Sequence, residues 1–181
     1  MNNEKPILSI KGEYKDTIKN LKTGEVTTKE GCNLIVDSFY TLIASLLAGK
    51  TSSGLKYWAV GSGDDTWGTP LPTPTPDDTK LLNEIGRKVI TPGNIQFLDE
   101  FGVVSETPTN IIRITVTFGA DECNGTWREF GIFGGNCSEA MDSGIMIDRK
   151  IHGRIDKTSE MEVTRSIKIT IAGGTHTNAG F

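Results

Sequence analysis

The stretch Gly125–Gly135 carries the charged pair with the most potential for chemistry, Arg128 and Glu129, inside a short apolar run. Successive residues of a strand point to opposite faces, so alternation puts Trp127, Glu129 and Gly131 on one face and Arg128 on the other. Both faces then combine aromatic or apolar residues with a charge. This pattern predicts a strand in the middle of a packed sheet, with each charge held by a partner elsewhere.

These two charges cannot easily pair with each other, and Glu84 and Arg87 are their candidate partners. We expect Glu129 to meet Arg87, and Arg128 to meet Glu84 or an acidic group on another subunit. Gly131 is expected to be small because another backbone or the helix lies over it. The sequence therefore predicts a structural or interface site made of Glu84, Arg87, Trp127, Arg128, Glu129 and Gly131.

The other reactive residue types predict no catalytic site. Of the two histidines, His152 lies at a strand end and His176 in the C-terminal tail, and nothing in the sequence places a cysteine nucleophile near His152. Acidic pairs such as Asp121-Glu122 fall in expected loops, without the spacing of a calcium-binding loop. We therefore expect no catalytic residue, no metal site, no cofactor and no enzymatic activity.

Composition narrows the classes of partner. The chain has 181 residues and a formal net charge of −4, and this acidic balance argues against a nucleic-acid or anionic-membrane surface. Its 21 glycines and 7 prolines favour a β-rich chain with many turns. No signal peptide and no membrane span is predicted. Cys32, Cys123 and Cys137 are interpreted as unpaired thiols, although Cys123 and Cys137 could meet across a hairpin.

The elements that must position these residues are mostly strands. Residues 7–18 and 25–32 flank a Thr-Gly turn and predict an exposed hairpin. Asn33–Gly49 predicts the one clear helix, with Asn33 as its cap and Gly49 at its end. Its wide apolar face indicates a core helix lying on a sheet, or alternatively a helix buried between subunits.

From Asn110 onward, four strands with alternating apolar residues and connecting turns predict an antiparallel meander. The expected fold class is α+β: a mostly antiparallel β-sheet (meander) packed on one main α-helix, with an N-terminal β-hairpin arm. We expect an arm over residues 1–32, the α+β domain over 33–172, and a flexible C-terminal tail over 173–181.

Several short segments also follow one another in a distinctive order: Tyr57–Gly63, a proline-bearing loop, Leu82–Arg87, Gly125–Phe133, Met146–Arg149 and Ser166–Ile171. In this order and spacing the chain resembles the N-terminal attachment domain of bacteriophage tail-fibre (tail-collar) proteins. The resemblance covers roughly Asn33–Ile171, and Ser62 stands where the family usually has an acidic residue.

This resemblance implies a structural virion protein of a bacteriophage or phage-like particle, made in the host bacterial cytoplasm. The family usually continues into a long fibre, whereas this sequence stops at Phe181, so the expected role is a tail, baseplate or fibre-attachment adaptor. Expected partners are copies of the chain, in a trimer or ring, and other phage tail or fibre proteins. A carbohydrate-binding module that recognises a host surface is the alternative, with Trp67 as the loop residue that would stack on a sugar.

Overall fold

The computed structural model describes residues 8–50 and 53–173, so all but the first residue of the expected 173–181 tail lies outside the described part. In chain order, the elements are β1 (Leu8–Asn20), β2 (Val26–Ile35), α1 (Ser38–Leu47), β3 (Leu55–Gly61), β4 (Glu84–Val89), the short 3-10 helix η1 (Pro92–Asn94), β5 (Ile95–Leu98), β6 (Val104–Ser105), β7 (Ile111–Phe118), β8 (Gly125–Gly134), β9 (Ile145–Lys157) and β10 (Met161–Gly173).

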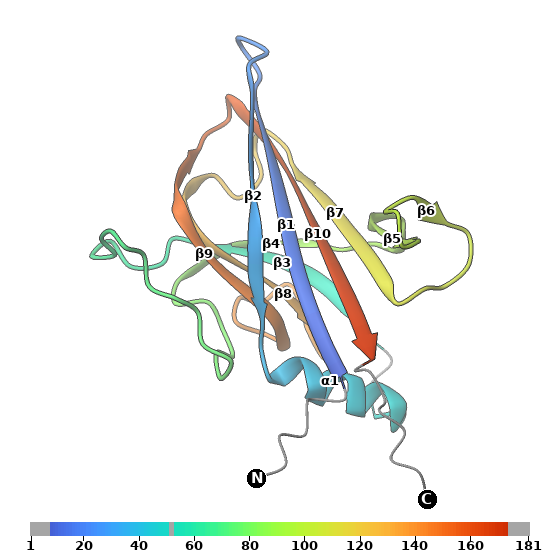
Figure 1. Cartoon of the computed structure of the whole chain (residues 1–181). Helices are drawn as coiled ribbons and strands as arrows, with labels where there is room; N and C mark the ends of the chain where they lie inside the picture. Colours follow the sequence, from blue (N-terminus) through green and yellow to red (C-terminus); the bar gives the residue numbers. More distant parts are fainter. Residues whose placement is uncertain (1–7, 51–52, 174–181) are drawn as a thin grey trace, which may run out of the picture.

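The strands form one antiparallel sheet that folds over into two layers (Figure 1). The strand order is β4-β3-β8-β9-β2-β1-β10-β7-β5-β6. We call the layer of β2, β1, β10, β7, β5 and β6 sheet 1, and the layer of β4, β3, β8 and β9 sheet 2. The two layers are joined by β2, because its residues 26–33 pair with β1 whereas Leu34 and Ile35 pair with β9.

The main core fills the space between the layers, because each sheet turns an apolar face inward. The alternation predicted for β7 is confirmed, since Val116 and Phe118 are buried in this core. Aromatic rings from the two sheets meet edge to face across it. The ring centroids of Phe118 and Trp127 are 5.0 Å apart, and those of Tyr14 and Phe130 are 5.4 Å apart.

Sheet 2 is also covered on its outer face. Residues 62–83, between β3 and β4, and residues 135–144, between β8 and β9, pass over this face and bury a second apolar cluster beneath them. Its members are Val36, Tyr57, Ala59, Leu81, Phe133, Cys137 and Met146. Because sheet 2 is buried on both sides, its strands carry apolar residues on both faces, as expected for a central strand at Gly125–Gly135.

The predicted fold class is wrong, because the chain is mostly β-sheet with a single short helix rather than an α+β sheet packed on a main helix. Residues 33–35 belong to β2 and not to the helix, since Leu34 and Ile35 pair with β9. Helix α1 closes one end of the two layers (Figure 1) and buries only Phe39 and Leu42. Its outward-facing residues remain exposed.

The predicted meander and the separate N-terminal arm are wrong as well. Strands β8 and β9 do pair, but β2 and β1 lie between β9 and β10, and β7 pairs with β10 and β5 instead of β8. The described part of the expected arm, residues 8–32, is not an arm, because β1 lies inside sheet 1 between β2 and β10. Residues 1–7 of the expected arm lie outside the described part. Only the far end of the β1–β2 hairpin projects from the body (Figure 1).

Candidate functional site

All six residues of the predicted site lie in sheet 2, two on β4 and four on β8. Strict alternation would put Trp127 and Phe130 on opposite faces, but both are buried in the main core. The cause is a shift in the register between β8 and β9 that falls between Trp127 and Glu129. Glu129 and Gly131 contact the residues that cover the outer face of the sheet.

Glu84 and Arg87 form the first of two charge clamps on that outer face. Arg87 donates from Nε to Glu84 Oε1 at 2.6 Å and from Nη2 to Glu84 Oε2 at 2.8 Å. The same guanidinium donates to the carbonyl oxygen of Ser138 at 2.8 Å and to Ser143 Oγ at 2.9 Å, while Glu84 accepts from the Asp142 N–H at 3.0 Å. This clamp therefore fastens the 135–144 loop to β4.

Glu129 and Arg149 form the second clamp, together with Asp78. Arg149 donates from Nη2 to Glu129 Oε2 at 2.6 Å and from Nη1 to Asp78 Oδ2 at 2.9 Å. The second oxygen of Glu129 accepts from the Asn83 N–H at 3.0 Å. The predicted pairing of Glu129 with Arg87 is wrong, and the clamp instead holds the segment that follows the prolines, through Asp78 and Asn83, against the sheet.

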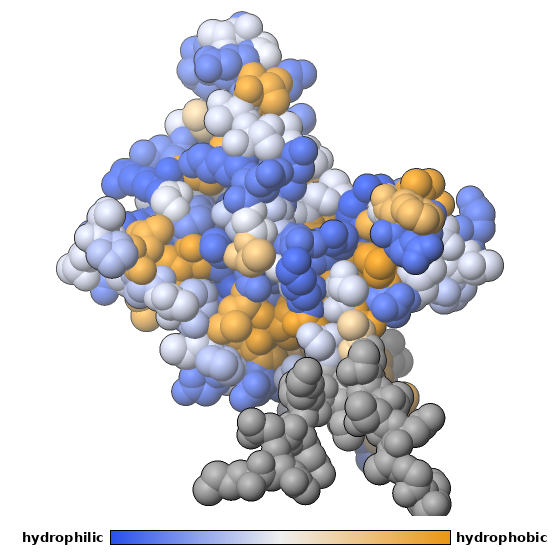
Figure 2. Space-filling model, in the orientation of Figure 1, coloured by the Kyte–Doolittle hydropathy of each residue, from blue (hydrophilic) through white to orange (hydrophobic). Residues whose placement is uncertain are grey.

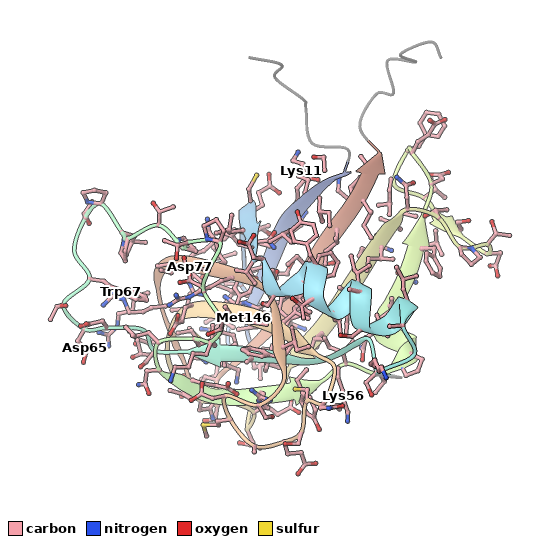
Figure 3. All side chains as sticks on the ribbon, turned by 90° about the horizontal axis from the view of Figure 1, so that it is seen from below. Lys11, Lys56, Asp65, Trp67, Asp77 and Met146 are labelled. Atoms are coloured by element: carbon pink, nitrogen blue, oxygen red, sulfur yellow. The ribbon has the colours of Figure 1, made fainter. Side chains whose placement is uncertain are left out.

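Arg128 holds the other end of the 62–83 loop. It donates to the carbonyl oxygens of Asp64 at 2.6 Å and of Trp67 at 2.5 Å, so the expected pairing with Glu84 is wrong. The guanidinium carbon also lies 5.6 Å from the centroid of the Trp67 ring. Figure 3 shows this loop running outside the sheet, with Asp65, Trp67 and Asp77 labelled.

Trp67 is the residue on which the carbohydrate-binding alternative depended. The ring is half-buried and packs directly over Gly63, where a Cβ would lie 2.2 Å from a ring carbon. With Gly63 below it and Arg128 beside it, the ring is used to fasten the loop. The other two tryptophans, Trp58 and Trp127, are fully buried.

Gly131 lies against the main chain of another strand, as expected. A Cβ there would be 2.8 Å from the carbonyl oxygen of Asp148 on β9 and 3.4 Å from Leu81 of the covering loop. Gly61 is similarly confined, because its Cβ would lie 2.7 Å from the Asn83 carbonyl and 2.8 Å from the Glu129 side chain. The glycines thus let the loop and the charge clamp approach the sheet closely.

A buried triad of Asp16, Arg165 and His152 was missed by the sequence reasoning. Arg165 is completely buried between the sheets and donates to both oxygens of Asp16, at 3.0 and 2.9 Å. Its Nη2 lies 2.9 Å from His152 Nε2, and its guanidinium carbon lies 4.5 Å from the ring centroid of Phe130. The signal was available, because Arg165 interrupts the inward-facing apolar series of β10.

The geometry of the triad fixes the state of His152. Its Nδ1 lies 2.8 Å from the carbonyl oxygen of Gly153 and must donate, so Nε2 is left to accept from Arg165. Burial and the neighbouring Arg165 lower the pKa of His152 from its ordinary 6.5 to about 3. The imidazole is therefore neutral, with both nitrogens engaged, which leaves it no position from which to act as a general base.

Asp148 is a second buried carboxylate, next to the strand that joins the two sheets. It is fully buried and accepts hydrogen bonds from the Ile132 N–H at 2.7 Å and from Asn33 Nδ2 at 2.6 Å. Burial raises the pKa of Asp148 from its ordinary 3.8 to about 7. It pairs in register with Ile35, so this carboxylate lies at the junction of sheets 1 and 2.

The remaining reactive groups do not converge. Over residues 8–50 and 53–173, no group of three or more histidine, cysteine or acidic residues is arranged to hold a metal ion. The three cysteines are free, with Cys32 exposed and Cys137 buried against Arg87, so no disulfide joins Cys123 to Cys137. In the same part of the chain, no helix is long and apolar enough to cross a membrane.

Two open hollows of about 670 and 540 Å³ lie along β1, β7 and β10. Several of their charged side chains are already partnered, as Arg113 donates to Gln96 and Lys168 pairs with Glu13. Their hydroxyls bond to each other across the strands, with Thr115 and Ser166 oxygens 2.9 Å apart. Most of the polar side chains that line these hollows are therefore engaged within the sheet.

No protein-family model matches the sequence, and a search of curated proteins finds no match either.

Proposed function

We propose that this chain is a structural protein of a bacteriophage or phage-like particle, acting as a tail, baseplate or fibre-attachment adaptor through protein–protein contacts. The observation that carries the proposal is where apolar side chains are left exposed. Phe101 and Leu47 are 82% and 85% exposed, at the β5–β6 turn and at the end of α1. The β5–β6 turn projects from the body, with apolar surface at its end (Figure 2). Exposed apolar residues grouped on projections are typical of docking surfaces.

The charged residues support an architectural role. Glu84, Arg87, Glu129 and Arg149 use their hydrogen-bonding groups to fasten loops to sheet 2. Inside the core, Arg165 on β10 pairs with Asp16 on β1. Because these buried charges form ion pairs and hydrogen bonds that hold the loops and the two sheets in place, the protein is suited to presenting rigid surfaces.

The segments that resemble tail-fibre attachment domains also contact one another. The end of Tyr57–Gly63 lies under Glu129 and the Asn83 carbonyl, and the Leu82–Arg87 segment supplies both Asn83 and the Glu84 clamp. Met146–Arg149 supplies the partner of Glu129. Four of these segments, Tyr57–Gly63, Leu82–Arg87, Gly125–Phe133 and Met146–Arg149, therefore form one connected part of sheet 2, whereas Ser166–Ile171 lies on β10 in sheet 1.

The proposed partners are further copies of the chain, in a trimer or ring, and neighbouring tail or fibre proteins. Repeated weak contacts between projections and neighbouring bodies gain strength from multivalency in a closed assembly. The proposed location is the virion.

The test is mass spectrometry of particles purified by density gradient from producing cells. The proposal expects the chain in the particle fraction, at a fixed copy number relative to the other particle proteins, and retained after high-salt washing. A chain found only in the soluble fraction, with particles of normal composition lacking it, would overturn the proposal.

A further inference from the structure

Two apolar surfaces on different elements are left exposed among the described residues 8–50 and 53–173. The first is the turn between β5 and β6, where Phe101, Val103 and Val104 are all exposed. The second is the last turn of α1, where Leu46 and Leu47 are exposed. Phe101 and Leu47 are the two most exposed large apolar side chains of the described residues. Neither is needed to complete the core, so each is available to another molecule.

The β5–β6 turn, which we call the finger (residues 99–103), is held in a fixed shape. Asp99 Oδ1 accepts from the N–H groups of Phe101 at 2.9 Å and Val103 at 2.8 Å. The main chain closes the same turn, with the Asp99 N–H donating to the Val103 carbonyl at 2.8 Å and Gly102 at φ +82°. Because the turn is already ordered, little conformational entropy is lost when Phe101 docks.

A hollow of about 300 Å³ lies beside the end of α1. It is lined by Ser45, Lys50, Gly135, Asn136, Gly144 and Ile145. Two of its lining residues are glycines with positive φ, +66° for Gly135 and +93° for Gly144. A cavity of about 150 Å³ is enough to hold benzene, so the hollow has room for one aromatic ring. Its lining contains one cation, Lys50, and no carboxylate.

We propose that the finger of one copy docks into the α1 hollow of a second copy, with Phe101 in the hollow and Glu100 beside Lys50. This inference rests on the proposed function, for which it specifies the contact between copies. Charge complementarity supports a second copy as the occupant, because Phe101 follows Asp99 and Glu100 whereas the hollow offers only a positive charge. The contact joins two different surfaces, so repetition would generate a ring or an open chain of copies.

The experiment measures self-association of the full chain by sedimentation velocity and native mass spectrometry over a concentration series. Phe101→Ala is expected to weaken association about 30-fold or more, as for a central aromatic anchor. Glu100→Lys and Lys50→Glu are each expected to weaken association, and the double variant is expected to restore it. Val26→Ala, which truncates an exposed apolar residue at the far end of the β1–β2 hairpin, is the matched control and should leave association unchanged.

The substituted residues are exposed, so circular dichroism and the unfolding midpoint should match those of the wild-type protein. A chain that stays monomeric at its highest soluble concentration overturns the inference, as does association that is insensitive to Phe101→Ala or a charge swap without rescue. The proposed function would still stand in those cases if the chain is present in purified particles. If the chain is absent from particles but its association still depends on Phe101, the proposed function is overturned and the proposed contact between copies is retained.

Discussion

Replacing His152 with glutamine is expected to uncover a pH dependence of stability that the wild-type protein conceals. Two of the buried titratable groups, His152 and Asp148, have pKa values shifted in opposite directions, to about 3 and about 7. Glutamine can still accept the hydrogen bond from Arg165 but cannot become protonated, so the variant removes one titration and keeps the contact.

The sign of each contribution follows from the direction of its shift. For His152 the folded pKa is lowered, so its contribution to stability is present above pH 6.5 and is lost as the pH falls towards 3. For Asp148 the folded pKa is raised, so its contribution is present below pH 3.8 and is lost as the pH rises towards 7. Between about pH 4 and pH 6.5 the two slopes oppose each other.

In that window each group changes the free energy of unfolding by about 1.4 kcal/mol per pH unit. Relative to wild type, His152→Gln should therefore lose about 3 kcal/mol over two pH units as the pH rises from 4 to 6. The matched variant Asp148→Asn should show the opposite trend and gain about as much over the same range. Other carboxylates titrate in all three proteins, so the difference from wild type isolates each group.

The assay is urea unfolding followed by tryptophan fluorescence at constant ionic strength, at several pH values from 4 to 6.5. The buried Trp127 packs beside Phe118 and reports the loss of the core. If the difference in unfolding free energy between His152→Gln and wild type is constant across this range, the opposing titrations proposed for the buried pair are refuted.

Three further predictions concern residues that hold the covering loops and strands of sheet 2 together. Glu129→Ala should destabilise the fold by about 3–5 kcal/mol, because it leaves Arg149 partly buried without its main partner. In urea unfolding, the double variant with Arg149→Ala should lose less stability than the sum of the two single variants, and full additivity would argue against the pair. Gly131→Ala should cost about 1–3 kcal/mol because its Cβ would press on a main-chain carbonyl of β9, and an unchanged midpoint of thermal unfolding would contradict that close approach. Arg128→Lys should free the 62–83 loop, which limited proteolysis would detect as faster cleavage there with little change in global stability, whereas an unchanged cleavage rate would show that the loop is held by other contacts.

The local patterns of the strands could be read from the sequence, but their neighbours could not. The alternation of β7 and the central position of β8 are confirmed. Pairing partners depend on strand order, which alternation does not encode. Arg87 lies on β4, two strands away from β8, whereas Arg149 lies on the adjacent β9. The predicted meander did place the strand of Arg149 beside β8, but the alternation did not show that Arg149 and Glu129 share the outer face, and so the prediction chose the wrong arginine.

The helix boundary failed for a related reason. The apolar residues Leu34, Ile35 and Val36 fit a helical stripe, but they equally suit a strand that enters a second sheet. The pairing of β2 with β9 decides between the two, helped by the buried hydrogen bond from Asn33 to Asp148. This hydrogen bond joins residues 115 positions apart, and local helix or strand propensity cannot predict such a contact.

The position of β10 between β1 and β7 has a consequence for biosynthesis. The pairing of Leu8 with Gly173 joins the start and the end of the described chain, so sheet 1 has a gap until translation has passed β10. The β1–β2 hairpin can form early from neighbouring residues, but Asp16 then lies on an unpaired strand edge and lacks its ion-pair partner Arg165 until β10 is in place. We expect the nascent chain to remain incompletely folded until β10 has left the ribosome, and to gain protease resistance when this strand enters the gap between β1 and β7.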